Sequence, residues 1–381
     1  MGKKTVINYN ESELEDQVAK AVKEHDAVAA ALNFFSFLAP SGIPLCYVTP
    51  CKSSYPEPLS SLSDSEWERL FKVLDAHGLV LLGRSELCLL PYVQDRARLR
   101  LDALTADGFI QAGVQFISSI FADKGSTRLD EISRMAWHTA VLAGWAIEAG
   151  MKEQLEPLLD LLDWEGRVLI DAWPDRAIIS HLRGIQLCKT LKGESHSGVA
   201  IRINNLGQAW HRLGEFERAE TYLQRALSRL EKKFGSHHQL VANLLGNLAL
   251  LRRDKRQIDE AADYFKRALA LVDNDHGLEN QLVNLCVNGL GRIIKNRQGA
   301  EVAAEFLAES LEKSVSASGI KYHPNIAMVF NNLGLLQLEA GHKDMARRSF
   351  GVAMNIARRS LPQNHPLHRQ IFINRKPLDA G

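Results

Sequence analysis

One pattern of leucine and small residues occurs four times in the second half of this chain, at a spacing of 42 or 43 residues. A leucine position and two small-residue positions keep this spacing throughout. The positions in register are Leu206, Leu248, Leu290 and Leu333; Ala219, Ala261, Ala303 and Ala346; and Ala226, Ala268, Ser310 and Ala353. A fixed period of this length is typical of helical hairpins that stack, because a single hairpin cannot bury its apolar face alone.

Each repeat predicts two closely packed helices. In the first helix the leucine is followed by a small residue, which lets the second helix approach; these residues are Gly207, Ala249, Gly291 and Gly334. In the second helix the two small positions lie two turns apart on one face. Gly214 and Gly341 predict the turns between helices, because glycine readily adopts the positive φ that ends a helix. The chain therefore predicts an α-solenoid.

The pattern resembles the tetratricopeptide repeat. Its leucine followed by a small residue, its Arg-Ala pairs and its Arg-Ala-Leu positions match that family, and the long period is similar to the kinesin-light-chain subtype. The resemblance covers about residues 200–366 and implies four repeats. Ala177 and Gly184 lie 42 residues before Ala219 and Ala226, so a degenerate repeat is expected ahead of them.

Charge and cysteine content favour an intracellular protein without a strong electrostatic field. The formal charge is +1, from 46 basic and 45 acidic residues, so nothing in the overall charge attracts nucleic acid or an anionic membrane. The opening residues do not resemble a signal peptide and no apolar run is long enough to span a bilayer. The five scattered cysteines predict reduced thiols rather than a disulfide framework. We therefore expect a cytoplasmic protein that does not bind membranes.

The first third of the chain predicts helices followed by a hairpin. An apolar helix is expected at 27–38, and a second helix begins at Asp64 and runs to Leu74, where His77 and Gly78 cap it. Two short apolar runs follow, 79–82 and 87–90, separated by a turn at Gly83. This order predicts a winged helix, so we expect an all-α protein for the most part, with a winged-helix-like module ahead of the solenoid.

Residues 37–45, together with 79–84 and 93–94, resemble the winged helix of STAND-type NTPases of the NB-ARC class that carry tetratricopeptide sensor arms. In that family a histidine after the hairpin contacts the nucleotide, but Leu90 and Pro91 occupy the matching positions here. Residues 2–5 match only the tail of a phosphate-binding loop, with no preceding strand or first glycine. We therefore expect no nucleotide and no other cofactor. The chain is then expected to be a truncated relative, a partner fragment, or a protein that kept the sensor and lost the NTPase.

Other chemistry finds little support in the sequence. His237, His238, His365 and His368 have no cysteine or carboxylate at ligand spacing, so no metal site is predicted. Cys46 and Cys51 lack redox-motif spacing. Catalytic motifs of hydrolases, metalloproteases and kinases are not found, so the chain is not expected to be an enzyme. The candidate recognition helix carries more acidic than basic residues, which makes nucleic acid an unlikely partner.

The groove of the solenoid is the remaining candidate site. First helices line the concave surface of stacked hairpins, and asparagine amides there can pair with the backbone of an extended peptide through both donors and an acceptor. In the kinesin-light-chain-like family, asparagines at these places contact cargo peptides. The candidate residues are Asn204, Asn205, Gln208, Arg212, Asn243, Asn247, Asn288, Arg292, Asn331 and Asn332.

The expected organisation is a polar lead-in at 1–26, the winged-helix-like module at 27–100, irregular hairpins and a degenerate repeat at 101–199, the four repeats at 200–366 and a tail at 367–381. Turns are predicted at Gly150 and at Glu165–Gly166, and Pro366 is expected to end a helix. The sequence thus predicts a non-catalytic scaffold or sensor arm that binds a protein or peptide. The alternatives are a DNA-binding regulator that senses a peptide and, third, an ATP-dependent signalling enzyme.

Overall fold

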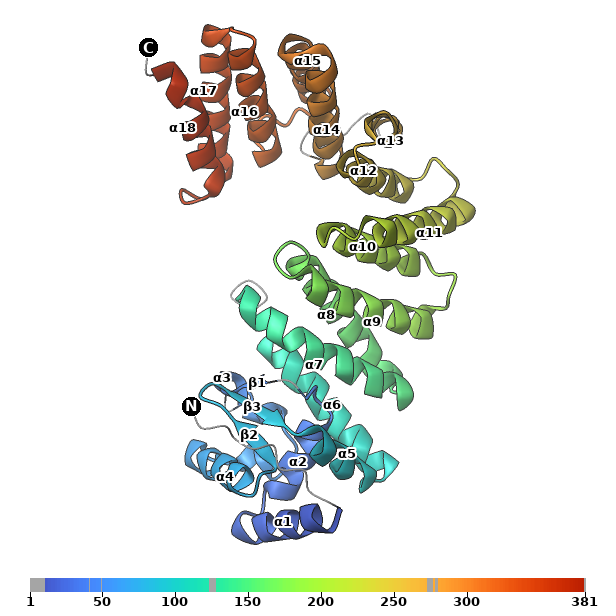
Figure 1. The fold of residues 1–381 in the computed structure, drawn as a ribbon, viewed down its shortest axis with the longest axis vertical. Coiled ribbons are helices and arrows are strands. Elements are labelled where there is room, and N and C mark those ends of the chain that lie inside the picture. Colours follow the sequence, from blue (N-terminus) through green and yellow to red (C-terminus); the bar gives the residue numbers. More distant parts are fainter. Residues whose placement is uncertain are drawn as a thin grey trace. The chain divides into compact units, whose positions relative to one another are not determined.

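The computed structural model describes residues 11–40, 42–48, 50–122, 128–272, 277 and 280–379. Residues 2–5, considered above as a phosphate loop, lie outside this set. The chain divides into two compact bodies, Met1–Glu215 and Phe216–Gly381, whose elements are labelled in Figure 1. In the described residues both bodies are mainly helical, as predicted, and the strands form one small sheet in the first body. Within the same residues, none of the helices combines the length and the apolar character needed to cross a bilayer.

The first body begins with short helices around a small sheet. Its elements are α1 (Glu11–Glu24), α2 (Val28–Ser36), β1 (Ile43–Pro44), α3 (Leu45–Val48), α4 (Asp64–Ala76), β2 (Val80–Leu82), β3 (Glu86–Leu89) and α5 (Pro91–Leu99), with single 3₁₀ turns at Lys52–Ser54 and Leu59–Ser61. Helix α4 begins after Ser63, which forms a reciprocal capping box with Glu66, and ends at His77. The helix and the β2–β3 hairpin confirm the predicted order of elements.

The sheet and the first helix of this region differ from the sequence prediction. The antiparallel sheet has the order β1-β3-β2, because Ile43 pairs with Leu87 and adds a third strand to the hairpin. The residues expected as a polar lead-in contain α1, whose Leu14 and Ala21 are buried. Leu90, which the resemblance to STAND NTPases aligns with a nucleotide-contacting histidine, is 9% exposed and directly precedes α5.

Five longer helices complete the first body: α6 (Ala103–Ile120), α7 (Leu129–Glu148), α8 (Lys152–Leu169), α9 (Pro174–Lys192) and α10 (Ser197–Arg212). The turn predicted at Gly150 is confirmed, since this residue has a φ of +70° between α7 and α8. The turn predicted at Glu165–Gly166 is wrong, because both residues lie inside α8.

Glu165 and Gly166 lie inside α8 because of a buried polar network and close helix packing, respectively. A Cβ at Gly166 would overlap the ring of His181 on α9, so the glycine permits the helices to approach. Glu165 is fully buried, with its oxygens 2.6 Å from Thr139 Oγ1 on α7 and 3.3 Å from Ser180 Oγ on α9. Burial raises the pKa of Glu165 to about 8, against the weaker opposing effect of those two hydroxyl groups. The Glu-Gly pair therefore joins three helices.

The second body is a succession of helices that pack in hairpins. They are α11 (Phe216–Phe234), α12 (Gln239–Asp254), α13 (Ile258–Ala270), α14 (Gln281–Gln298), α15 (Ala300–Ser318), α16 (Pro324–Glu339), α17 (Lys343–Ser360) and α18 (Pro366–Asp379). Helices α12, α14 and α16 each pack on the helix that follows them, and they also contact one another in sequence order. These first helices of the hairpins therefore form one continuous face.

The small residues of the repeat lie where the helices meet, as predicted. Ala261 and Ala346 are fully buried in the second helices. A Cβ at Gly334 would lie 2.8 Å from Cε1 of Phe350, and one at Gly291 would lie 3.0 Å from Cδ2 of Leu307. Because a Cβ at Gly334 would overlap the Phe350 ring and one at Gly291 would crowd Leu307, glycine permits the close spacing of these hairpins.

The prediction that Pro366 ends a helix is wrong, because this residue begins α18. Proline is tolerated in the first turn of a helix, because the backbone N–H groups there make no hydrogen bond within the helix. Helix α18 packs on α16 and α17, and it buries Leu367, Ile371 and Leu378. Residues expected as a tail of uncertain order thus cover the end of the apolar core.

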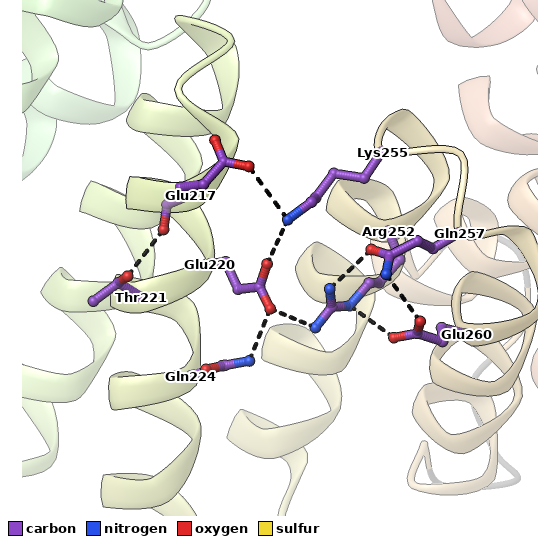
Figure 2. Close-up of polar contacts among 8 residues, drawn as sticks. All are labelled: Glu217, Glu220, Thr221, Gln224, Arg252, Lys255, Gln257 and Glu260. Carbon is purple, nitrogen blue, oxygen red and sulfur yellow. Dashed lines mark hydrogen bonds and ion pairs between the residues drawn. The ribbon is translucent and has the colours of Figure 1, made fainter.

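An ion network fixes α11 against the next hairpin (Figure 2). The carboxylate of Glu220 accepts hydrogen bonds from Arg252 Nη2 at 2.6 Å and from Lys255 Nζ at 2.7 Å. Arg252, which is 8% exposed, also lies 3.1 Å from Glu260 and donates to Gln257 at 2.9 Å. The hydrogen bond from Lys255, ahead of the contacts from Arg252, lowers the pKa of Glu220. Charge pairing thus supplements apolar packing between repeats.

Candidate functional site

A pocket of about 170 Å³ opens between α14 and α16. Its apolar lining comes from Gly291, Leu307, Leu335 and Leu336, and Leu335 remains 39% exposed. Three residues predicted from sequence line it as well: Asn288, Arg292 and Asn332. The first-helix face therefore brings part of the predicted site together around an apolar hollow.

Amide side chains connect the two helices at this pocket. Asn332 Nδ2 donates to Asn288 Oδ1 at 2.7 Å, across from α16 to α14. Asn288 Nδ2 in turn donates to the backbone oxygen of Asn284 at 2.9 Å, and Asn284 Nδ2 donates to the backbone oxygen of Asn325 at 3.1 Å. Each amide is therefore held in a defined orientation by its neighbour.

The pocket also carries charges that the sequence reasoning missed. Lys295 Nζ lies 2.6 Å from Glu339 Oε2, and this ion pair joins α14 to α16 beside the hollow. Arg292 is exposed, and within the described part of the chain it has no carboxylate partner. Helical spacing could have revealed the missed residues, because Lys295 follows Arg292 by three positions and Glu339 follows Asn332 by seven.

The other predicted residues of the second body lie outside the pocket. Asn331 is 1% exposed, and its Oδ1 accepts a hydrogen bond from Asn374 of α18 at 3.0 Å, so it helps to attach the last helix. On α12, Asn243 is exposed and Asn247 is half-buried. That Asn243 and Asn247 contact a ligand stays a prediction.

Four predicted residues lie on α10 and belong to the first body. Asn204 Nδ2 donates to Asn205 Oδ1 at 3.3 Å, and Gln208 is half-buried. Arg212 Nε lies 3.0 Å from Asp171, with both side chains more than half exposed. Asn204, Asn205, Gln208 and Arg212 therefore form a separate polar group along one helix.

The described residues contain no cluster of three or more His, Cys, Asp or Glu side chains that could hold a metal ion. All five cysteines are free thiols. On α14, burial raises the pKa of Cys286 to about 12, so this thiol stays protonated at neutral pH and is a poor nucleophile. The side chains that line the pocket offer hydrogen bonding, apolar contact and charge.

Sequence comparison identifies the repeats. The family model described as tetratricopeptide repeat matches residues 199–274, which span α10 to α13. No curated protein matches the chain. The chain thus contains tetratricopeptide repeats, a repeat class whose stacked helices form binding surfaces for other proteins.

Solved structures with a similar arrangement include two of interest. BtubC (BKLC) from P. vanneervenii is 19% identical, and the match covers 67% of this chain and 94% of that one with a TM-score of 0.44. A signal transduction ATPase with numerous domains (STAND) with a tetratricopeptide repeat sensor, from Pyrococcus horikoshii, is 13% identical with a TM-score of 0.50. That match covers 98% of this chain but only 50% of the STAND protein, so this chain spans half its length.

Proposed function

We propose that this chain is a non-catalytic cytoplasmic scaffold that binds an extended peptide segment of a partner protein, with the α14–α16 pocket at the centre of the site. The observation that carries the proposal is the Asn332–Asn288 amide pair beside an apolar hollow. An amide has two N–H donors and one acceptor oxygen. Asn332 uses one donor on Asn288, and among the described residues its second N–H and its oxygen stay available for a peptide backbone.

The neighbouring side chains supply the other parts of a peptide site. Leu335 and Leu336 provide the apolar surface on which a partner side chain can be buried, and Arg292 provides an exposed charge at its edge. Backbone pairing gives affinity that is independent of sequence, whereas the hollow selects a side chain. We propose Asn243 and Asn247 as further ligand contacts in the second body, and the α10 group as a separate set of ligand contacts in the first body.

We further propose that residues 27–100 form a winged-helix-like module and that the chain is related to STAND-type signalling proteins. The fold similarity to the STAND protein across 98% of this chain supports this relationship. The alternative of DNA binding through α4 is less well supported. Arg69, one of two basic residues on that helix, donates to the backbone oxygen of Glu24 on α1 and is therefore already engaged.

The proposal is tested by measuring the affinity of a partner peptide for pocket variants. Capture with the purified chain and mapping of the retained segment identify the peptide, and fluorescence anisotropy gives its Kd. Loss of one amide contact is expected to weaken binding by about 1 kcal/mol. Asn288→Ala combined with Asn332→Ala should therefore raise the Kd about thirtyfold.

Asn355→Ala is the matched control, because Asn355 is an exposed amide on α17, a second helix. It should leave the Kd unchanged. An unchanged Kd for the Asn288→Ala, Asn332→Ala variant, with its helicity intact by circular dichroism, would mean that the amides do not hold the peptide.

A further inference from the structure

A second hollow lies in the first body, between α7 and α9, and has a volume of about 340 Å³. Trp137, Val141, Ile179 and Leu182 give it apolar walls. Leu182 is 46% exposed, so the hollow is open to solvent along α9. We call this feature the α7–α9 groove. The peptide pocket proposed above is lined by other helices, in the other body.

One cation lies in this apolar groove. The guanidinium of Arg183 rests against the backbone of α7, where a Cβ at Gly144 would lie 3.3 Å from each of its Cζ, Nη1 and Nη2 atoms. These equal distances place the flat face of the guanidinium on Gly144. Arg183 Nη1 donates to Gln186 Oε1 at 2.7 Å. In the described residues no carboxylate pairs with Arg183, although its charge lies beside tryptophan and aliphatic surface.

We propose that the α7–α9 groove is a second binding site, for a peptide segment that presents an apolar side chain next to an acidic one. The apolar side chain lies against Trp137 and Ile179, where an aromatic ring gains from offset or edge contacts with the indole. The carboxylate accepts a charge-assisted hydrogen bond from Arg183. The amide of Gln186 fixes the orientation of the guanidinium before the ligand arrives.

The open form of the groove favours a peptide over a free small molecule. Small-molecule sites cover most of their ligand's surface, whereas a groove with Leu182 half exposed covers only one side. A peptide extends its contacts beyond the hollow along α7 and α9. Among the described residues that line the groove, Arg183 is the one cation, and it matches one acidic side chain rather than a run of charges.

The experiment compares two short blocked peptides by intrinsic tryptophan fluorescence of the full-length chain. N-acetyl-Phe-Glu-Ala amide carries the proposed pair of side chains, and N-acetyl-Phe-Gln-Ala amide differs only in the charge. The acidic peptide is expected to bind about fivefold more tightly. Arg183→Gln should abolish this difference, and Trp137→Phe should remove the fluorescence change because Trp137 contacts the ligand.

Lys192→Gln is the matched control, because Lys192 also lies on α9 but pairs with Glu156 of α8, at 3.6 Å. It should retain the preference for the acidic peptide, as should the Asn288→Ala, Asn332→Ala variant of the other site. Equal affinity for the two peptides, or no binding of either one up to about 10 mM, would overturn the proposal. Tighter binding of 4-phenylbutyrate than of the acidic peptide would overturn it in favour of a small-molecule site.

Discussion

Replacing Glu165 by glutamine should remove a large pH dependence from the stability of the first body. Burial favours the protonated form of this carboxyl group, and the hydrogen bonds around it can accommodate the added proton. Thr139 Oγ1 lies within hydrogen-bonding distance of both the Met135 backbone oxygen, at 3.2 Å, and Glu165 Oε1, at 2.6 Å, but its hydroxyl has one proton to donate. Both contacts are satisfied when Thr139 donates to Met135 and a protonated Glu165 donates to Thr139. Glutamine can replace the acid because its amide N–H makes the same donation.

The magnitude follows from the difference in pKa between the two states. The pKa of Glu165 is about 8 in the folded chain, against an ordinary value of 4.5. Because the folded pKa is the higher one, the stability contribution is fully present below pH 4.5 and is lost as the pH rises to 8. The loss amounts to about 1.4 kcal/mol per pH unit, or roughly 5 kcal/mol across this window. Glu165→Gln should match the wild type near pH 4.5 and be several kcal/mol more stable near pH 8.

Urea unfolding followed by tryptophan fluorescence measures this effect selectively. All six tryptophans lie at or before position 210, so the signal reports on the first body alone. Glu153→Gln is the control, because Glu153 is an exposed residue of the same helix, and it should keep the wild-type pH dependence. Identical slopes of unfolding free energy against pH in the wild type and Glu165→Gln would refute a buried neutral carboxyl group.

Three further outcomes are expected. Ala261→Arg should destroy hydrogen-exchange protection in α12 and α13, because the long charged side chain has no space between these helices. The tryptophan unfolding curve should stay unchanged. Uniform unfolding, or no effect on protection, would contradict the repeat register. Glu220→Gln should destabilise the second body by about 1 kcal/mol near pH 7, more than Glu217→Gln. Since the pKa of Glu220 is lowered on folding, this difference should vanish as the pH falls through the folded pKa; its persistence in acid would refute the ion network. Millimolar ATP or ADP should leave the Tm unchanged, because Leu90 lies where the resemblance to STAND NTPases would require a nucleotide-contacting histidine; a clear upward shift would indicate a nucleotide site.

The repeats could be predicted from sequence because their spacing depends on small residues that physics constrains tightly. Gly334 and Ala261 lie where a larger side chain would separate two helices. The small residues therefore recur at fixed positions that the sequence alone reveals. The amide positions Asn288 and Asn332 could be predicted for a similar reason, since they neighbour the packing leucines. Asn331 shows the limit of this reasoning, because α18 covers it and α18 itself was not expected.

The remaining features depend on contacts between residues distant in sequence. Gly166 resembled a turn residue in the sequence. Its glycine is instead explained by the ring of His181 on another helix, which leaves no space for a Cβ. Pro366 resembled a helix end because proline occurs both after helices and in their first turn. The α7–α9 groove was missed because Trp137 and Arg183 come together only through the packing of two helices.

Site-specific photocrosslinking tests the central claim most directly. The photoreactive residue p-benzoylphenylalanine would replace either Leu335, which lines the α14–α16 pocket, or Val352 on α17; these side chains are 39% and 40% exposed, so reactivity is matched. We predict that irradiation in cells links a partner protein to position 335 and not to position 352, and that Asn288→Ala with Asn332→Ala abolishes the link. Equal crosslinking at both positions, or a link at 335 that survives loss of both amides, would contradict a peptide site on the first-helix face.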